Sequence, residues 1–136
     1  LMKNIMLGAE LNNNYPEDSK IYFGGPVNLD VGFVLHESSY KTDKTLNISK
    51  DLSITSDHKI IKDIQKNNGP NNFIFTLGYA GWDKKQLKDE IQNGDWIITP
   101  ADSKYIFHED DSKKWDLYSS LLGINHNDFT GQVGRA

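Results

Sequence analysis

Short apolar runs and a period of two predict the strands of this chain. Residues 20–23 and 31–36 are two such runs separated by a glycine-containing loop, and we expect strands there that can pair as neighbours. Residues 72–79 form the most apolar run, rich in β-branched and aromatic side chains, which predicts a central strand. A further strand is expected at residues 95–99, before a proline.

A strict alternation between Leu46 and Ile54 predicts a strand or hairpin with one buried face. The apolar side chains of Leu46, Ile48, Leu52 and Ile54 should form that face, with a turn or edge at Lys50-Asp51.

Helical spacing marks other segments. Ile60, Ile61 and Ile64 form a stripe in a helix expected between Ser56 and Asn67, with Gly69 suited to end it. Asp83 and Gln86 have the spacing of a capping box, in which each side chain bonds the other residue's backbone amide. Further helices are expected near residues 1–11, from 84 to Gly94, and at 111–122.

These elements predict an α+β fold, with a mixed or mostly antiparallel sheet packed with helices in a single domain, residues 1–136. We expect one core to unite the apolar strand, the strand after it and the two later helices. Its members should be Phe73, Phe75, Leu77, Leu87, Ile91, Ile97, Trp115 and Leu121.

Net charge and composition exclude some classes of binding partner and indicate where the protein acts. The net charge is -4 and Arg135 is the single arginine, so we expect no direct binding to duplex DNA. There is no cysteine, and no apolar run approaches the roughly 20 residues of a membrane span. We expect a cytoplasmic protein without membrane contact. The cluster at residues 108–111 is interpreted as a helix start, and no metal site or cofactor is expected.

Several ordered motifs resemble those of the bacterial AlgH/YqgE family. They are Gly24-Gly25-Pro26-Val27, residues 32–36 and Gly78-Tyr79-Ala80-Gly81-Trp82, followed by Gln86-Leu87, Glu90-Ile91, Trp96, Trp115, Gly123, Gly134 and Ala136. The resemblance implies a single AlgH-like domain and the label of a transcriptional regulator. It also implies that strands found at the N-terminus of the family precede the point where this sequence starts, so we expect a chain that lacks them.

The two glycine motifs and one histidine are the candidate ligand-binding positions. Glycines permit a positive φ or a close backbone approach, and we expect the motifs to lie at strand ends with at least one glycine at positive φ. His36 ends an apolar strand, and is read as a structural histidine or as a base facing a cleft. The candidates are Gly24, Gly25, Pro26, His36, Gly78, Tyr79, Gly81 and Trp82.

Two functions stay open from the sequence. The first is a non-enzymatic regulatory or accessory protein that binds a protein or small molecule. The second is an enzyme with a small-molecule site between the Gly24–Val27 and Gly78–Trp82 motifs that uses His36. The sequence assigns no catalytic residue, no partner and no oligomeric state.

Overall fold

The chain forms two compact units, one that ends at Ala80 and one that begins at Gly81. The structure is a computed structural model and describes residues 20–108 and 110–123. The expected N-terminal helix, Arg135, Gly134 and Ala136 lie outside the described residues. Each unit is described by itself.

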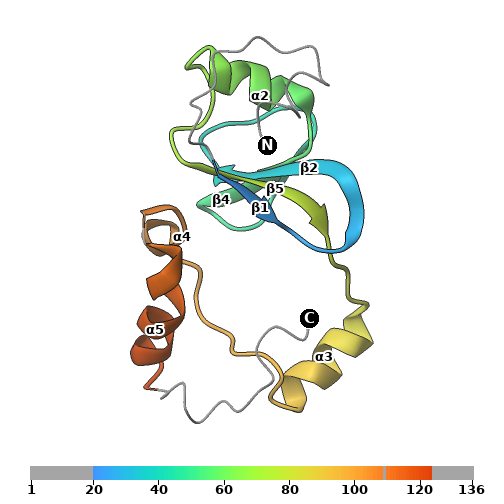
Figure 1. The fold of residues 1–136 in the computed structure, drawn as a ribbon, viewed down its shortest axis with the longest axis vertical. Helices are drawn as coiled ribbons and strands as arrows, with labels where there is room; N and C mark the ends of the chain where they lie inside the picture. Colours follow the sequence, from blue (N-terminus) through green and yellow to red (C-terminus); the bar gives the residue numbers. More distant parts are fainter. Residues whose placement is uncertain (1–19, 109, 124–136) are drawn as a thin grey trace. The chain divides into compact units, whose positions relative to one another are not determined.

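The first unit contains a five-stranded mixed sheet (Figure 1), with the strand order β1-β5-β2-β4-β3. β1 runs parallel to β5, and the other neighbouring pairs are antiparallel. With the helices, this confirms the predicted α+β class. The strands are β1 (Ile21–Phe23), β2 (Val27–Glu37), β3 (Thr45–Asn47), β4 (Leu52–Thr55) and β5 (Phe73–Tyr79).

The expectation that the first two strands pair with each other is wrong. β5 lies between them, with Phe23 of β1 opposite Leu77 on one side and Gly32 of β2 opposite Leu77 on the other. Local apolar patterns mark where strands are, but the choice of partner depends on contacts distant in sequence. A strand some fifty residues later takes the place between them.

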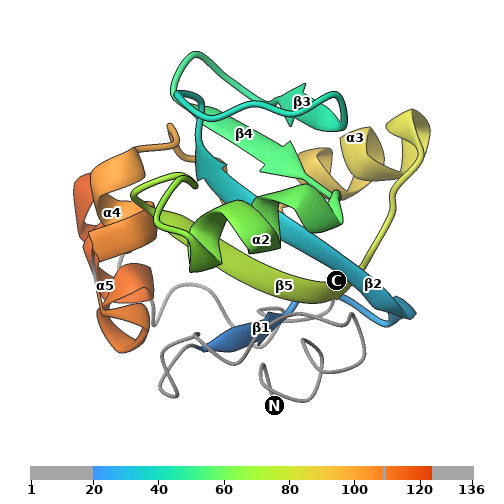
Figure 2. The same cartoon turned by 90° about the horizontal axis from the view of Figure 1, so that it is seen from above.

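The core of this unit lies between the sheet and helix α2 (His58–Gln65). Figure 2 shows α2 lying across β2 and β5. Ile60 and Ile61 of the helix are buried with Val34 of β2 and Phe75 of β5, so the predicted isoleucine stripe is confirmed. Residues packed against this cluster include Ile21, Tyr40, Ile64, Phe73 and Leu77.

The hairpin of β3 and β4 forms as predicted, but a polar face is the more deeply buried one. Leu46 is 70% exposed, whereas Ser53 and Thr55 are 0% and 1% exposed. These hydroxyls can be buried because each has a partner: Thr55 Oγ1 lies 2.7 Å from Thr45 Oγ1, and Ser53 Oγ donates to Asn47 at 2.9 Å.

Two helices end in the same hydrogen-bonded motif, in which a residue at positive φ follows the last turn. At α2 this residue is Asn67, with φ of 59°, rather than the predicted Gly69. At α3 (Lys84–Gln92) it is Gly94, with φ of 77°, as expected. Asparagine tolerates this conformation better than most side chains, so the positive φ can fall at Asn67, two residues before Gly69.

The second unit contains α3, α4 (Ser103–His108) and α5 (Asp111–Leu121). Asp83 caps α3 by accepting from the Gln86 backbone N–H at 2.8 Å, as predicted. The Gln86 side chain donates from Nε2 to Glu90 Oε1 at 3.0 Å. Residues 95–99 form no strand, and α4 was not predicted. None of the helices within the described residues is long and apolar enough to cross a membrane.

The predicted core is confirmed for its residues on β5. Phe75 lies in the core with Phe73 and Leu77 packed around it, but Leu87, Ile91, Trp115 and Leu121 are each exposed by a third or more. Ile97 is half-buried. Among the residues described after Gly81, Ser119 alone is buried. Helical spacing therefore identified an apolar stripe correctly without showing what covers it.

Candidate functional site

The glycines of the two motifs bring the ends of β1 and β5 into direct backbone contact. The Gly24 N–H donates to the Leu77 carbonyl at 2.8 Å. A Cβ placed on Gly24 would lie 2.3 Å from the Gly78 carbonyl oxygen, and one on Gly78 would lie 2.3 Å from the Gly25 carbonyl oxygen. Such distances exclude any side chain, so glycine is required by packing.

Two of these glycines also need their backbone freedom. Gly78 has φ of 72° and Gly25 has φ of 156°, both disfavoured for residues with a Cβ. The prediction of positive φ at strand ends is confirmed. Gly78 is the single β5 residue opposite residues 28–31 of β2, since Val27 pairs with Tyr79 and Gly32 with Leu77. The start of β2 therefore bulges outward, as its wide curve in Figure 1 shows.

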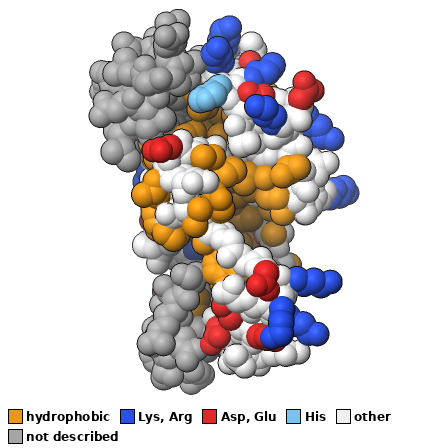
Figure 3. All heavy atoms as spheres, turned by 90° about the vertical axis from the view of Figure 1, so that its right-hand side faces the viewer, with side chains coloured by type: hydrophobic (Ala, Val, Ile, Leu, Met, Phe, Trp, Pro, Cys, Tyr) orange, Lys and Arg blue, Asp and Glu red, His pale blue; other side chains and the backbone are white. Residues whose placement is uncertain are grey.

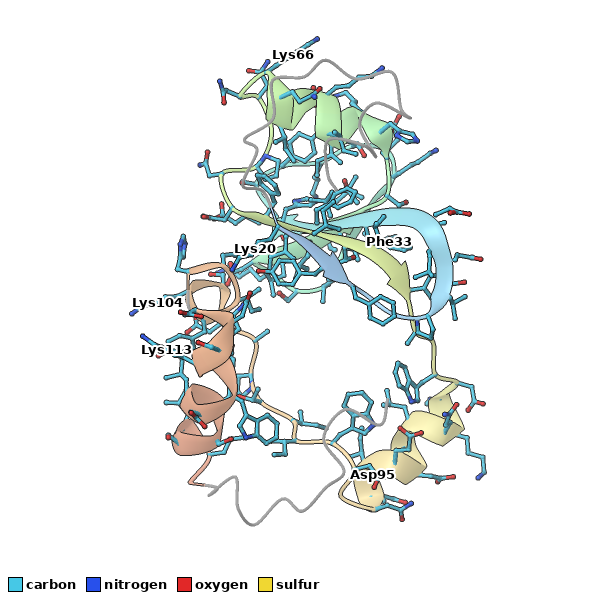
Figure 4. The ribbon with its side chains drawn as sticks, viewed as in Figure 1. Lys20, Phe33, Lys66, Asp95, Lys104 and Lys113 are labelled. Carbon is cyan, nitrogen blue, oxygen red and sulfur yellow. The ribbon has the colours of Figure 1, made fainter. Side chains whose placement is uncertain are left out.

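Apolar side chains gather around this bulge. Leu29 is 53% exposed, and its Cδ2 lies 2.9 Å from where a Cβ of Gly78 would stand. The Tyr79 ring meets Phe33 edge to face at a centroid distance of 6.0 Å. Figure 3 faces this side and shows apolar side chains gathered there; Phe33 is labelled in Figure 4. We name Val27, Leu29, Phe33 and Tyr79 the apolar patch.

His36 lies away from the glycine motifs. It pairs with Phe73, five residues before Gly78 on β5, a separation of about 17 Å along the strand. The side chain is 0% exposed. Its Nδ1 lies 2.7 Å from the Glu37 carbonyl oxygen and its Nε2 lies 2.7 Å from Thr55 Oγ1. The structural interpretation of His36 is therefore the one that fits: the ring is buried and each of its nitrogens has a hydrogen-bond partner.

The remaining candidates differ in their surroundings. Pro26 is exposed at the bend between β1 and β2. Gly81 has no atom within 4 Å of a built Cβ, so packing does not require a glycine there. Trp82 belongs to the second unit, where its indole N–H donates to Glu90 Oε2 at 2.9 Å.

Glu90 joins two tryptophans and was missed by the sequence reasoning. The same Oε2 accepts from the indole N–H of Trp96 at 2.8 Å, and the two rings meet edge to face at 5.3 Å. The N–H donation of Trp96, followed by those of Gln86 and Trp82, lowers the pKa of Glu90 despite partial desolvation. The cluster ties the segment after α3 back onto that helix, where a strand was expected.

Sequence reasoning also missed Leu29 and Phe33 as neighbours of the glycine motifs. The available signal was the density of apolar residues from Val27 to Val34, where the sequence predicts a strand only from Val31 and a loop before it. A bulge of four residues opposite one glycine does not change the local pattern of apolar and polar residues, so that pattern does not predict it.

Known proteins resemble the chain over most of its length. The UPF0301 protein of Marinomonas sp. (strain MWYL1) is 34% identical over 128 residues, which cover 94% of this chain and 68% of that protein. The UPF0301 protein of Ralstonia pickettii (strain 12J) is 35% identical, over 88% of this chain and 63% of that protein. The chain therefore spans about two thirds of the length of these relatives.

A solved structure agrees with the fold. The solution structure of the AlgH protein from Pseudomonas aeruginosa matches with a TM-score of 0.77 and 30% identity, covering 98% of this chain and 72% of that one. The family model described as AlgH-like matches residues 2–127. On these matches, the chain belongs to the AlgH-like family.

Proposed function

We propose that this chain is a non-enzymatic regulatory or accessory protein that acts by binding another protein through the apolar patch. The observation that carries the proposal is the position of Leu29 and Tyr79, large exposed side chains beside the close backbone contact of Gly25 and Gly78. Exposed apolar clusters on soluble proteins commonly mark interaction sites. Tyrosine is also enriched among the residues that dominate binding energy.

The charge next to the patch indicates the chemistry of the partner. Asp30 is exposed within the same bulge, between Leu29 and Val31. A complementary surface would present apolar side chains to Leu29 and Tyr79 and a lysine or arginine to Asp30, since opposed charges steer association and fix register. We therefore propose an apolar partner surface with a basic rim.

The enzyme alternative depends on His36 as its titratable residue, and the position of that side chain argues against this role. His36 is buried on β2 with both ring nitrogens engaged, and about 17 Å of strand separates its partner Phe73 from Gly78. A general base needs hydrogen-bond reach to a substrate. The placement of His36 favours binding over catalysis.

Regulation, in this proposal, is indirect and cytoplasmic. The net charge of -4 and the near absence of arginine disfavour contact with duplex DNA, which depends on phosphate neutralisation. A titration of labelled duplex at physiological salt should show no saturable binding tighter than about micromolar. Tighter binding with a steep salt slope would point to direct regulation.

Site-specific photo-crosslinking tests the binding surface. A photoreactive amino acid replaces Leu29 in one variant and Leu46, an equally suitable exposed leucine on β3, in another. The proposal predicts a discrete crosslinked protein at position 29 that disappears when Tyr79→Ser is added, with none at position 46. Equal products at both positions, or none at position 29, would contradict it.

A further inference from the structure

Two Asn-Gly pairs follow helices in this chain, Asn68-Gly69 after α2 and Asn93-Gly94 at the end of α3. In such a pair the backbone nitrogen of the glycine can attack the Cγ of the asparagine side chain, and the missing Cβ leaves the approach unhindered. The Asn-Gly dipeptide is the same at both places, and the residues on either side differ. The two helix ends hold the pairs differently, and a rate difference that vanishes in urea would come from that difference in structure.

The pair at α3 is held within the hydrogen-bonded helix end. Asn93 keeps helical angles, with φ of -77° and ψ of -4°. The Gly94 N–H donates to the Ile91 carbonyl at 3.1 Å, and the Asp95 N–H donates to the Glu90 carbonyl at 3.0 Å. The nucleophilic nitrogen is therefore bonded, and the backbone must leave its helical conformation before it can reach the side chain.

The Asn-Gly pair at α2 lies two positions further along the same motif, because Asn93 is the C-cap of α3 whereas Asn68 is the second residue after the C-cap Lys66. Here Asn67 takes the positive φ, its N–H donates to the Ile64 carbonyl at 3.1 Å, and the Asn68 N–H donates to the Asp63 carbonyl at 2.8 Å. The motif is complete at Asn68, so the Gly69 nitrogen is the first one beyond it. Among the described residues no backbone carbonyl accepts from Gly69, and the Asn68 side chain is exposed.

We propose that Asn68 is a site of spontaneous deamidation and that Asn93 is protected from it. The Gly69 nitrogen forms a bond to Cγ of Asn68, the Cγ–Nδ2 bond breaks, and the proton of the Gly69 amide leaves with Nδ2 as ammonia. Water then opens the resulting five-membered imide at either carbonyl, which yields aspartate or isoaspartate at position 68. The net reaction consumes one water and releases one ammonia.

The product changes the end of α2, which Lys66 marks in Figure 4. A carboxylate appears beside the C-terminal end of the helix, where the partial negative charge of the backbone disfavours it. The isoaspartate form also lengthens the main chain by one atom directly after the Asn68 N–H bond to Asp63. Aged protein should therefore be less stable in its first unit.

Peptide mapping by mass spectrometry of the folded protein, incubated at mildly alkaline pH, measures both sites at once. We expect conversion at Asn68 to be about tenfold faster than at Asn93 or more, the factor that corresponds to one protecting hydrogen bond. In urea the two rates should converge, because both pairs then lack structure.

Matched variants complete the test. Asn68→Gln should abolish the product at that site and leave conversion at Asn93 unchanged, and Asn93→Gln should leave Asn68 unaffected. Absence of product at Asn68, equal rates at both sites in the folded protein, or a difference that persists in urea would each overturn the proposal.

Discussion

At the scale of single residues, Gly78 meets two independent demands. Its φ of 72° is unfavourable for residues with a Cβ, and a built Cβ would lie 2.3 Å from the Gly25 carbonyl oxygen. We predict that Gly78→Ala destabilises the protein by at least about 2 kcal/mol, with Gly81→Ala as the control within about 0.5 kcal/mol. Urea denaturation measures both, and equal midpoints would show that the backbone contact is dispensable.

Glu90 gives a residue-scale prediction on pH. Its pKa is lowered from the ordinary value of 4.5, chiefly by the Trp96 N–H bond. A carboxyl with a depressed folded-state pKa stabilises the fold fully above its unfolded value and loses that contribution as the pH falls through the folded value. Tryptophan fluorescence should therefore change only on acidification below about pH 4.5. Glu90→Ala should remove this transition, and an unchanged acid transition in that variant would exclude Glu90 as its cause.

At the scale of elements, the sequence predicts correctly those features that depend on residues close together in the chain. The apolar stripe of Ile60 and Ile61 predicted α2, and the capping side chain of Asp83 predicted the start of α3. Residues 95–99 have strand propensity but pair with no strand among the described residues, and the Trp96 indole N–H donates to Glu90. The short α4 was missed because six residues show too little of a helical period.

The end of α2 carries the element-scale prediction. Asn67 holds φ of 59°, which asparagine tolerates and alanine resists. Asn67→Ala should cost about 1 kcal/mol, whereas Asn67→Gly should be neutral or slightly stabilising. Thermal or urea unfolding of the pair checks the order, and alanine as stable as glycine would mean that the helix end adapts without this conformation.

At the scale of the whole molecule, the sequence located the glycine motifs but not the surface around them. Gly24 and Gly78 could be identified from motif spacing, and the structure shows that their backbones are in contact. The arrangement of Leu29 over Gly78 depends on strand order and on a bulge of β2, both set by long-range pairing. His36 was a candidate because the sequence cannot show that Thr55 and the Glu37 carbonyl occupy its ring nitrogens.

The division of the apolar residues between core and surface makes a second prediction at this scale. Phe75 is buried against α2, whereas Leu87 is 37% exposed. Phe75→Ala should cost about 3 to 5 kcal/mol, and Leu87→Ala about 1 kcal/mol or less. Lys88→Ala is the surface control. Comparable losses for Phe75→Ala and Leu87→Ala in urea would contradict this difference in burial.

The affinity of the crosslinked partner for charge-bearing variants tests the central claim most directly. Calorimetric titration would compare the wild-type chain with Leu29→Lys in the apolar patch and Leu46→Lys on β3. We predict that Leu29→Lys weakens binding at least about thirtyfold, the loss of a dominant interface residue, while Leu46→Lys leaves the affinity within about twofold. Unchanged affinity for Leu29→Lys, or an equal loss for both variants, would contradict the assignment of the apolar patch as the binding surface.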